Sequence, residues 1–293
     1  MDRKSFIQQT ISGMISITGL SSFRQFTGGL EQQEKPMPVF FIGHGSPMNG
    51  IEDNIYSQNW KKIAEGIPVP KAVLVVSAHW LTKGTRVTAM DRPRTIHDFG
   101  GFPQALFDVQ YPAPGSPEIA RETIDTVKTT PIVADHEWGL DHGAWTIIRH
   151  MYPDANIPVL QLSIDYGKDA SYHYSLAAEL MTLRKKGVLI IGSGNMVHNL
   201  GMVAWDKLGQ PGFGFDWAIH MNDLFKKHIT NGNDDALIRY EQLGREARLA
   251  IPTPDHYFPL IYSLGLRKKE EEIQFFNDQA VGGSLTMTSV RFG

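Results

Sequence analysis

Four short apolar segments constrain the fold of this 293-residue chain more than any other feature of its sequence. Residues 39–42, 72–78, 158–163 and 187–191 are almost unbroken apolar runs, rich in Val, Ile and Leu. Strands that are covered on both faces have such runs, because neither set of alternating side chains meets water. We therefore predict four buried strands in a mostly parallel or mixed sheet.

Segments with helical spacing lie between these predicted strands. Residues 116–128 open with Ser-Pro-Glu, and residues 170–186 carry Lys and Arg in their last turn, as helix starts and ends do. Alternating strands and helices predict an α/β fold with helices on both faces of the sheet. No repeat or break in composition follows residue 38, so we expect residues 36–293 to form one catalytic domain.

The N-terminal segment, residues 1–35, differs from the rest of the chain. Charged residues at positions 2–4 precede an apolar stretch, residues 6–23, that weakly resembles an export signal but is interrupted by Gln8 and Gln9. We expect a signal-like or disordered segment. The expected location is cytoplasmic, and export to the periplasm stays open as the alternative. No segment reaches the roughly 18 apolar residues that a transmembrane helix needs.

Composition removes several classes of function. The chain has no cysteine, which excludes disulfides, thiolate nucleophiles, iron-sulfur clusters and zinc-thiolate sites. Its net charge is -3 and it has no long basic run, so it shows no electrostatic footprint for nucleic acid or an anionic membrane. We expect a small-molecule substrate and, for any metal, ligands drawn from His, Asp and Glu. No feature of the sequence specifies an oligomeric state.

Five of the eleven histidines lie at loops or element ends, mostly beside Gly or Pro. Open α/β sheets bind ligands beyond the carboxyl ends of their strands, so histidines that follow strands are expected to converge there. Imidazole suits Fe, Zn, Cu and Ni, and a catalytic metal needs three protein ligands plus open positions. The five candidates are His44 in GHGSP, His79 in SAHW, His142 in GLDHGAW, His198 in GSGNMVHN and His256 in TPDHYFP.

The other histidines are weaker candidates. Two of them, His97 and His136, lie in loops beside an acidic residue, and both a structural and a functional interpretation stay open for them. Four lie in polar or helical contexts and are expected to be structural: His150, His173, His220 and His228.

Two motifs that would indicate other functions are incomplete in this sequence. The string Gly192-Ser193-Gly194 follows a predicted strand, but a dinucleotide-binding loop would need a third glycine where Val197 stands. Neither Ser46 nor Ser193 lies in G-x-S-x-G, so a serine hydrolase is not indicated.

Seven strings resemble, in order and over residues 38–293, the 4,5-DOPA extradiol dioxygenase family of the class III (protocatechuate 4,5-dioxygenase-like) extradiol enzymes. They are GHGSPMN, VVSAHW, TIHDFGGFPQALFDVQYPAPGSP, DHGAW, MYPDANIPVLQLSID, GSGNMVHNL and PTPDHYFPL. The resemblance is specific because several long strings agree together. It implies a single-domain α/β subunit that inserts O2 into a catechol such as DOPA and yields a ring-opened semialdehyde acid.

The resemblance also implies one divalent metal per subunit, bound by His44, His79 and His256. Other class III enzymes have a glutamate among their three ligands, and His256 takes that place here. His198 is implied as a fourth ligand or as the acid/base group, and we favour it as the base. His142 resembles a further active-site histidine that faces the catechol or oxygen.

The chemistry favours Fe(II), because O2 cleavage needs electron transfer and Zn(II) has no redox chemistry. Zinc is nevertheless expected in purified protein, because it binds such sites more tightly. A zinc-dependent hydrolase using the same histidines is the alternative function, and a metal-binding protein without catalysis is a third.

The aromatic and Pro-rich segment 97–114 is expected to be a structured loop that excludes water from the site. Phe99, Phe102 and Tyr111 are its candidates for packing on a catechol. Ordinary anchoring of the loop also fits each of them.

Overall fold

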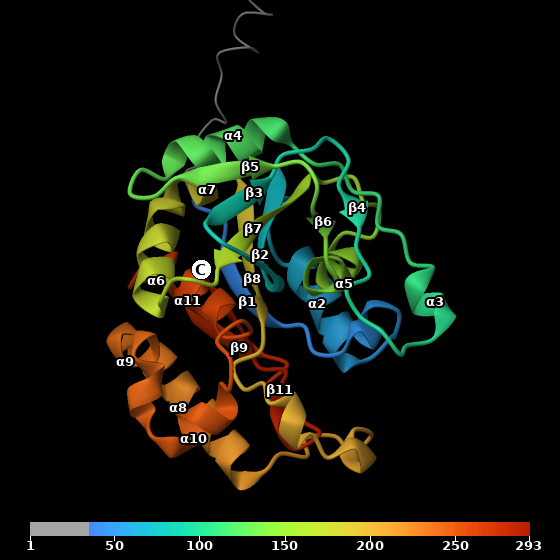
Figure 1. Cartoon of the computed structure of the whole chain (residues 1–293), viewed down its shortest axis with the longest axis vertical. Coiled ribbons are helices and arrows are strands. Elements are labelled where there is room, and N and C mark those ends of the chain that lie inside the picture. The colour runs from blue at the N-terminus through green and yellow to red at the C-terminus, as the bar shows by residue number, and fades with distance from the viewer. Residues whose placement is uncertain (1–34) are drawn as a thin grey trace, which may run out of the picture.

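The structure is a computed structural model that describes residues 35–293. The segment predicted to be signal-like or disordered, residues 1–35, lies outside the described residues except for Lys35. Within the described part of the chain, no helix is long and apolar enough to cross a membrane. Figure 1 shows a central sheet with helices packed on both of its faces.

The four predicted strands are present and lie side by side at the centre of an eight-stranded sheet. They pair in parallel, in the order β7, β2, β8 and β1. Antiparallel pairing of β3 with β7 and of β12 with β1 makes the whole sheet mixed, as predicted. In sheet order the strands are β5 (Ile132–Asp135), β3 (Thr85–Thr88), β7 (Val159–Asp165), β2 (Ala72–Thr82), β8 (Val188–Gly194), β1 (Val39–Gly43), β12 (Ser289–Phe292) and β9 (Ile273–Phe276).

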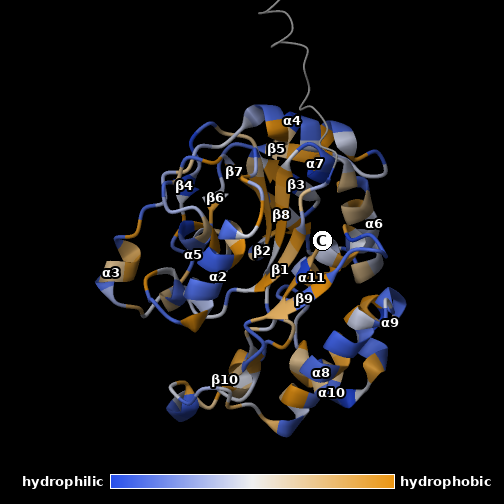
Figure 2. Cartoon of the chain, turned by 180° about the vertical axis from the view of Figure 1, so that it is seen from behind, coloured by the Kyte–Doolittle hydropathy of each residue, from blue (hydrophilic) through white to orange (hydrophobic). Residues whose placement is uncertain are grey.

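Alternating residues of the central strands face two separate hydrophobic cores. In β1, Val39 and Phe41 belong to one core, whereas Phe40 and Ile42 belong to the other. Both sets are fully buried, which is why the sequence of this strand is apolar throughout. The strands at the centre of the sheet accordingly stand out as hydrophobic in Figure 2.

Helices cover both cores, which confirms the predicted α/β fold class. The Val39 core is covered by α4 (Pro117–Thr126), α6 (Ala170–Glu179), α7 (Met181–Lys185), α8 (Asp216–Thr230), α9 (Asp234–Ile238), α10 (Arg245–Ala250) and α11 (Phe258–Gly265). The Phe40 core is covered by α2 (Ile55–Glu65), α3 (Gln104–Phe107) and α5 (His142–Met151).

One predicted helix is divided in the structure. Residues 170–186 form two helices, α6 and α7, with Leu180 between them. The backbone N–H of Leu180 donates to Ala177 and that of Leu183 donates to Leu180, so hydrogen bonds to the third preceding residue tighten the chain here. Both leucines are buried, and apolar spacing alone does not reveal such a local change. The prediction of one continuous helix was wrong.

The strand predicted for residues 72–78 runs further than expected. It was predicted to stop at His79, but β2 continues to Thr82. Its register against β7 shifts between Val76 and Leu81, and pairing then resumes with Leu81 opposite Ile164. His79 therefore lies inside an irregular part of the strand, where local bending re-aims side chains.

The segment 91–115, which includes the aromatic loop expected to be structured, contains short elements. It contains β4 (Arg94–Thr95), paired with β6 (Gly139–Leu140), and then α3, which lies in a lobe at the side of the molecule (Figure 1). A second small ribbon, β10 (Ala280–Val281) with β11 (Leu285–Thr286), lies near the C-terminal end of the chain. Elements of this length leave no periodic signal in the sequence.

Candidate active site

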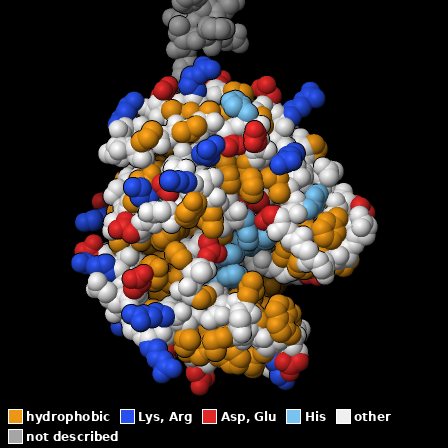
Figure 3. All heavy atoms as spheres, viewed as in Figure 1, with side chains coloured by type: hydrophobic (Ala, Val, Ile, Leu, Met, Phe, Trp, Pro, Cys, Tyr) orange, Lys and Arg blue, Asp and Glu red, His pale blue; other side chains and the backbone are white. Residues whose placement is uncertain are grey.

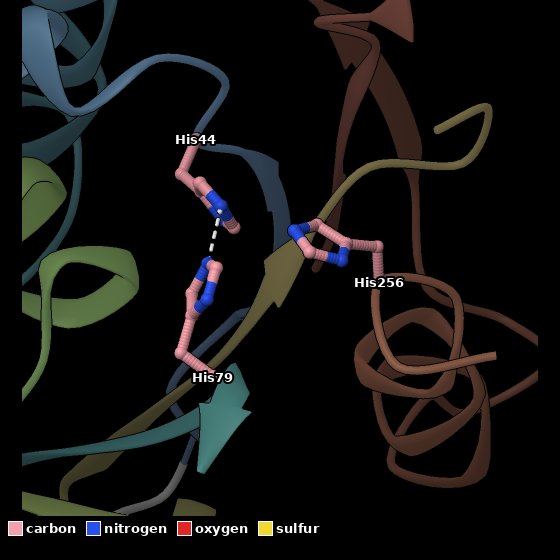
Figure 4. A group of neighbouring side chains, drawn as sticks. All are labelled: His44, His79 and His256. Atoms are coloured by element: carbon pink, nitrogen blue, oxygen red, sulfur yellow. Dashed lines mark hydrogen bonds between the residues drawn. The ribbon is translucent and has the colours of Figure 1, made fainter. Parts of the chain in front are cut away.

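Three of the five candidate histidines point toward one another. His44 follows β1, His79 lies on β2, and His256 comes from the segment between α10 and α11. One ring nitrogen from each lies within 4.8 Å of the others, and the Nε2 atoms of His44 and His79 are 3.0 Å apart. Figure 4 shows the three rings facing a common point.

The strand β8, which lies between the strands that lead to His44 and His79, ends in small residues. In the sheet, β8 lies between β2 and β1 and ends in Gly192, Ser193 and Gly194. A Cβ atom on Gly194 would lie 2.1 Å from the backbone oxygen of His256, so the two segments touch only because residue 194 has no side chain. The glycines of this string therefore serve close packing of the backbone.

We expect Gly194→Ala to disturb the site without removing any histidine. The added methyl group forces the backbone of His256 to move, and overpacking of this kind costs about 1–3 kcal/mol of stability. A lowered affinity for zinc, measured by titration of metal-free protein, checks the prediction. The control is Gly209→Ala, whose Cβ would have no neighbour within 4 Å. Equal zinc affinity in the two variants would contradict the packing argument.

Hydrogen bonds fix which nitrogen carries the proton in two of the rings. The hydroxyl of Ser193 donates to the backbone oxygen of Gly143 (2.5 Å), so its oxygen accepts from Nδ1 of His44 (3.0 Å). Similarly, Nδ1 of His256 donates to the carboxylate of Asp255 (2.5 Å). Both rings then carry an unprotonated Nε2, which is the form that binds metals.

The charges of the site favour neutral imidazoles. Burial, and then the positive charges of neighbouring histidines, hold the pKa values of His44 and His79 well below 6.5. For Asp255, burial opposes ionisation, but the hydrogen bond and charge of His256 outweigh it and lower the pKa of the carboxyl. Imidazoles that converge from three segments, supported by a carboxylate, are a donor set that fits one divalent metal.

His198 lies beside this donor set. Its ring stacks on that of His256, with 3.5 Å between ring centroids and 6° between planes. Burial, and then the charge of His256, lower the pKa of His198 to about 3. Among the described residues, two groups bring three possible ligand atoms together, and His198 belongs to neither.

His142 is the first residue of α5 and packs against His79, with 3.9 Å between ring centroids. A carboxylate that the sequence analysis did not single out holds it in place. The two oxygens of Asp98 accept from the backbone N–H of His142 and from its Nδ1, both at 2.9 Å. The atoms of His79, Asp98 and His142 form the second group of possible metal ligands in the described chain.

The aromatic loop contributes part of the surroundings of His142. The ring of Phe99 lies 5.7 Å from that of His142, and Phe102 packs on Phe99 at 5.5 Å. Tyr111 instead belongs to the hydrophobic core, and its hydroxyl donates to the backbone oxygen of Tyr152. Anchoring of the loop is therefore the better interpretation for Tyr111.

Other histidines have structural surroundings. The side chain of His150 bonds to the backbone oxygen of Asn49 at 2.8 Å, as expected for a structural residue. The side chain of His97, left open by the sequence, bonds to the backbone oxygen of Val109 at 3.0 Å within the aromatic loop. His173 is fully buried in the core beneath α11.

The histidine cluster can be reached from outside. Figure 3 shows histidine side chains in a hollow between the lobe that carries α3 and the lower part of the molecule, where Figure 1 labels β11. A small molecule could therefore approach the nitrogen atoms of the cluster.

Comparisons with known proteins agree with this geometry. The family description "catalytic LigB subunit of aromatic ring-opening dioxygenase" matches residues 38–284. A protein of Escherichia coli K12 named 4,5-DOPA dioxygenase extradiol is 47% identical, over 88% of this chain and 95% of that protein. A Beta vulgaris protein of the same name is 36% identical, over 87% and 96%.

A solved structure also matches the fold. The crystal structure of an uncharacterized protein from Escherichia coli K12 has a TM-score of 0.74 and 39% sequence identity, over 88% of this chain and 100% of that one. The family description covers most of the chain, and both named relatives are matched over nearly their whole length. The chain therefore belongs to the class III, LigB-type family of extradiol aromatic ring-opening dioxygenases.

Proposed function

We propose that the chain cleaves the ring of a catechol such as DOPA next to the diol, with one Fe(II) per subunit held by His44, His79 and His256. The observation that carries this proposal is the convergence of three imidazole nitrogens within 4.8 Å. Nδ1 of His44 is hydrogen-bonded to Ser193, and Nδ1 of His256 is hydrogen-bonded to Asp255. Nε2 of each ring is therefore available to a metal. The names of the relatives support the choice of a DOPA-like substrate.

If bound by these histidines, Fe(II) would supply redox chemistry towards O2 that Zn(II) would not. The histidines of the chain supply the rest of the site. All three proposed ligands are imidazoles and none is a carboxylate, so a bound divalent metal would keep its positive charge and would favour an ionised catechol.

His198 is proposed as the base that takes a proton from a catechol hydroxyl. The ring of His198 stacks on that of His256, so it lies next to the proposed ligands. It does not belong to the group of three nitrogens that His44, His79 and His256 form. Burial and the neighbouring His256 favour the unprotonated form of its ring by lowering its pKa, and this is the form that has a nitrogen open to a proton. Such general base catalysis is typically worth about 10²–10⁴ in rate.

His142 and the aromatic loop are proposed to border the substrate on another side. Phe99 and Phe102 are partly buried, and Phe99 contacts the ring of His142 edge-on. Apolar rings at this position would exclude water from a reactive intermediate and offer an edge or face to a catechol.

Oxygen uptake tests the proposed function directly. Metal-free protein is reloaded anaerobically with Fe(II) or with Zn(II), then mixed with L-DOPA or simple catechols in the presence of O2. We expect O2 consumption equal to the substrate consumed, and a yellow ring-opened product, with Fe(II) alone. The zinc-loaded protein is the matched control. Turnover that continues without O2 would instead favour the zinc-dependent hydrolase.

A further inference from the structure

Asp98, the acidic residue beside His97, lies between two of the candidate active-site histidines, His79 and His142. Its carboxylate accepts from the backbone N–H of His142 through Oδ1 and from the ring through Oδ2. The same Oδ2 lies 3.6 Å from Nδ1 of His79. The side chain of Asp98 is only 16% exposed, so water competes little for these contacts.

We propose that Asp98 is a positioning residue that keeps the ring proton of His142 on Nδ1 and so leaves Nε2 free to accept a proton or a hydrogen bond from the reacting molecules. A carboxylate has only acceptor atoms, so Nδ1 of His142 must be the donor in this contact. The inference rests on the proposed function, in which His142 borders the substrate.

The distances assign Asp98 to His142 and not to His79. The contact with Nδ1 of His142 is a normal hydrogen bond at 2.9 Å, whereas 3.6 Å to Nδ1 of His79 is too long for one. Loss of the carboxylate should therefore change which ring nitrogen of His142 carries the proton. It should have little effect on the metal affinity, which depends on His79.

The backbone contact makes an asparagine at this position a sharp test. The amide oxygen of Asp98→Asn must face the backbone N–H of His142, because an amide NH2 there would place donor against donor. The NH2 group then faces Nδ1 and donates to it. The ring proton has to move to Nε2, so the substitution inverts the tautomer while it keeps the size and shape of the side chain.

The experiment measures the tautomer and the turnover separately. In metal-free protein labelled with ¹⁵N-histidine, NMR should show His142 protonated on Nδ1 in the wild type and on Nε2 in Asp98→Asn. In Fe(II)-loaded protein with L-DOPA, kcat should fall at least about 10²-fold, the low end for loss of acid-base help. The affinity for zinc should change by less than about tenfold, the low end for loss of a hydrogen-bond partner of a ligand.

Asp135→Asn is the matched control. Asp135 also accepts backbone N–H groups in a loop, from Glu137 and Trp138, but it has no histidine partner. This variant should leave both the tautomer of His142 and kcat unchanged. If Asp98→Asn does not fold, Asp98→Ala replaces it, and the ring of His142 should then populate both tautomers.

Three results would overturn the inference. They are an unchanged Nδ1-protonated His142 in Asp98→Asn, an inverted tautomer with normal kcat, or a loss of zinc affinity well above tenfold, which would assign Asp98 to His79 instead. Absence of O2 uptake by the wild type would contradict the proposed function alone, because the NMR measurement on metal-free protein does not depend on turnover.

Discussion

Purified His79→Ala protein is expected to contain almost no bound metal and to show no O2 uptake with a catechol. The residue supplies one of three converging imidazole nitrogens, and its Nε2 lies 3.0 Å from that of His44. Removing it leaves two protein ligands, fewer than a catalytic metal site needs. Loss of a ligand's hydrogen-bond partner typically lowers metal affinity by about 10–100-fold. Loss of the ligand itself should lower the affinity for zinc by more than that.

Metal content after dialysis, together with a zinc titration of the metal-free protein, measures this effect. His220→Ala is the control, because His220 is exposed and its ring bonds to Glu246 at the surface, away from the histidine cluster. That variant should bind metal as the wild type does. Normal metal content in His79→Ala would refute its assignment as a ligand.

The second large effect is expected for His198→Ala, which should keep its metal and lose at least about 10²-fold in turnover. The stacked ring of His198 lies beside the ligand group but outside it, so the metal should stay bound. Turnover should fall because the variant lacks the stacked imidazole that is proposed to take the proton of the catechol.

Metal content and the rate of O2 uptake, measured on the same sample, separate the possible roles of this residue. Addition of free imidazole should restore part of the lost turnover if the side chain acts as a proton acceptor. Near-normal turnover would rule out the base, and loss of metal would make His198 a fourth ligand instead.

The central strands, and the sheet edge where the candidate histidines gather, could be predicted because burial leaves a clear trace in the sequence. In β1, side chains such as Phe40 and Phe41 enter different cores, so every position is apolar. The strand then has to end at Gly43, and His44 follows it at the edge where α/β sheets bind ligands.

The contacts that the sequence did not reveal are those set by tertiary structure. Asp98 and His142 are separated by 44 residues, and no spacing rule connects them. The continuation of β2 past His79 depends on a register shift against β7, which the residues of β2 do not encode by themselves. The role of Tyr111 was ambiguous because an aromatic residue in a loop can face either a ligand or the core.

The position of β8 has a consequence for how this site could be lost. Strands in a sheet lie about 4.8 Å apart, so β1 and β2, on either side of β8, are about twice that distance apart. Their histidines meet beyond the end of β8, where Ser193 bonds to the ring of His44 and the lack of a side chain on Gly194 lets the His256 segment pack. A descendant of this chain could keep every histidine and still lose the centre through one bulky residue there. Inheritance of the proposed metal centre therefore depends also on a strand that carries none of the three proposed ligands.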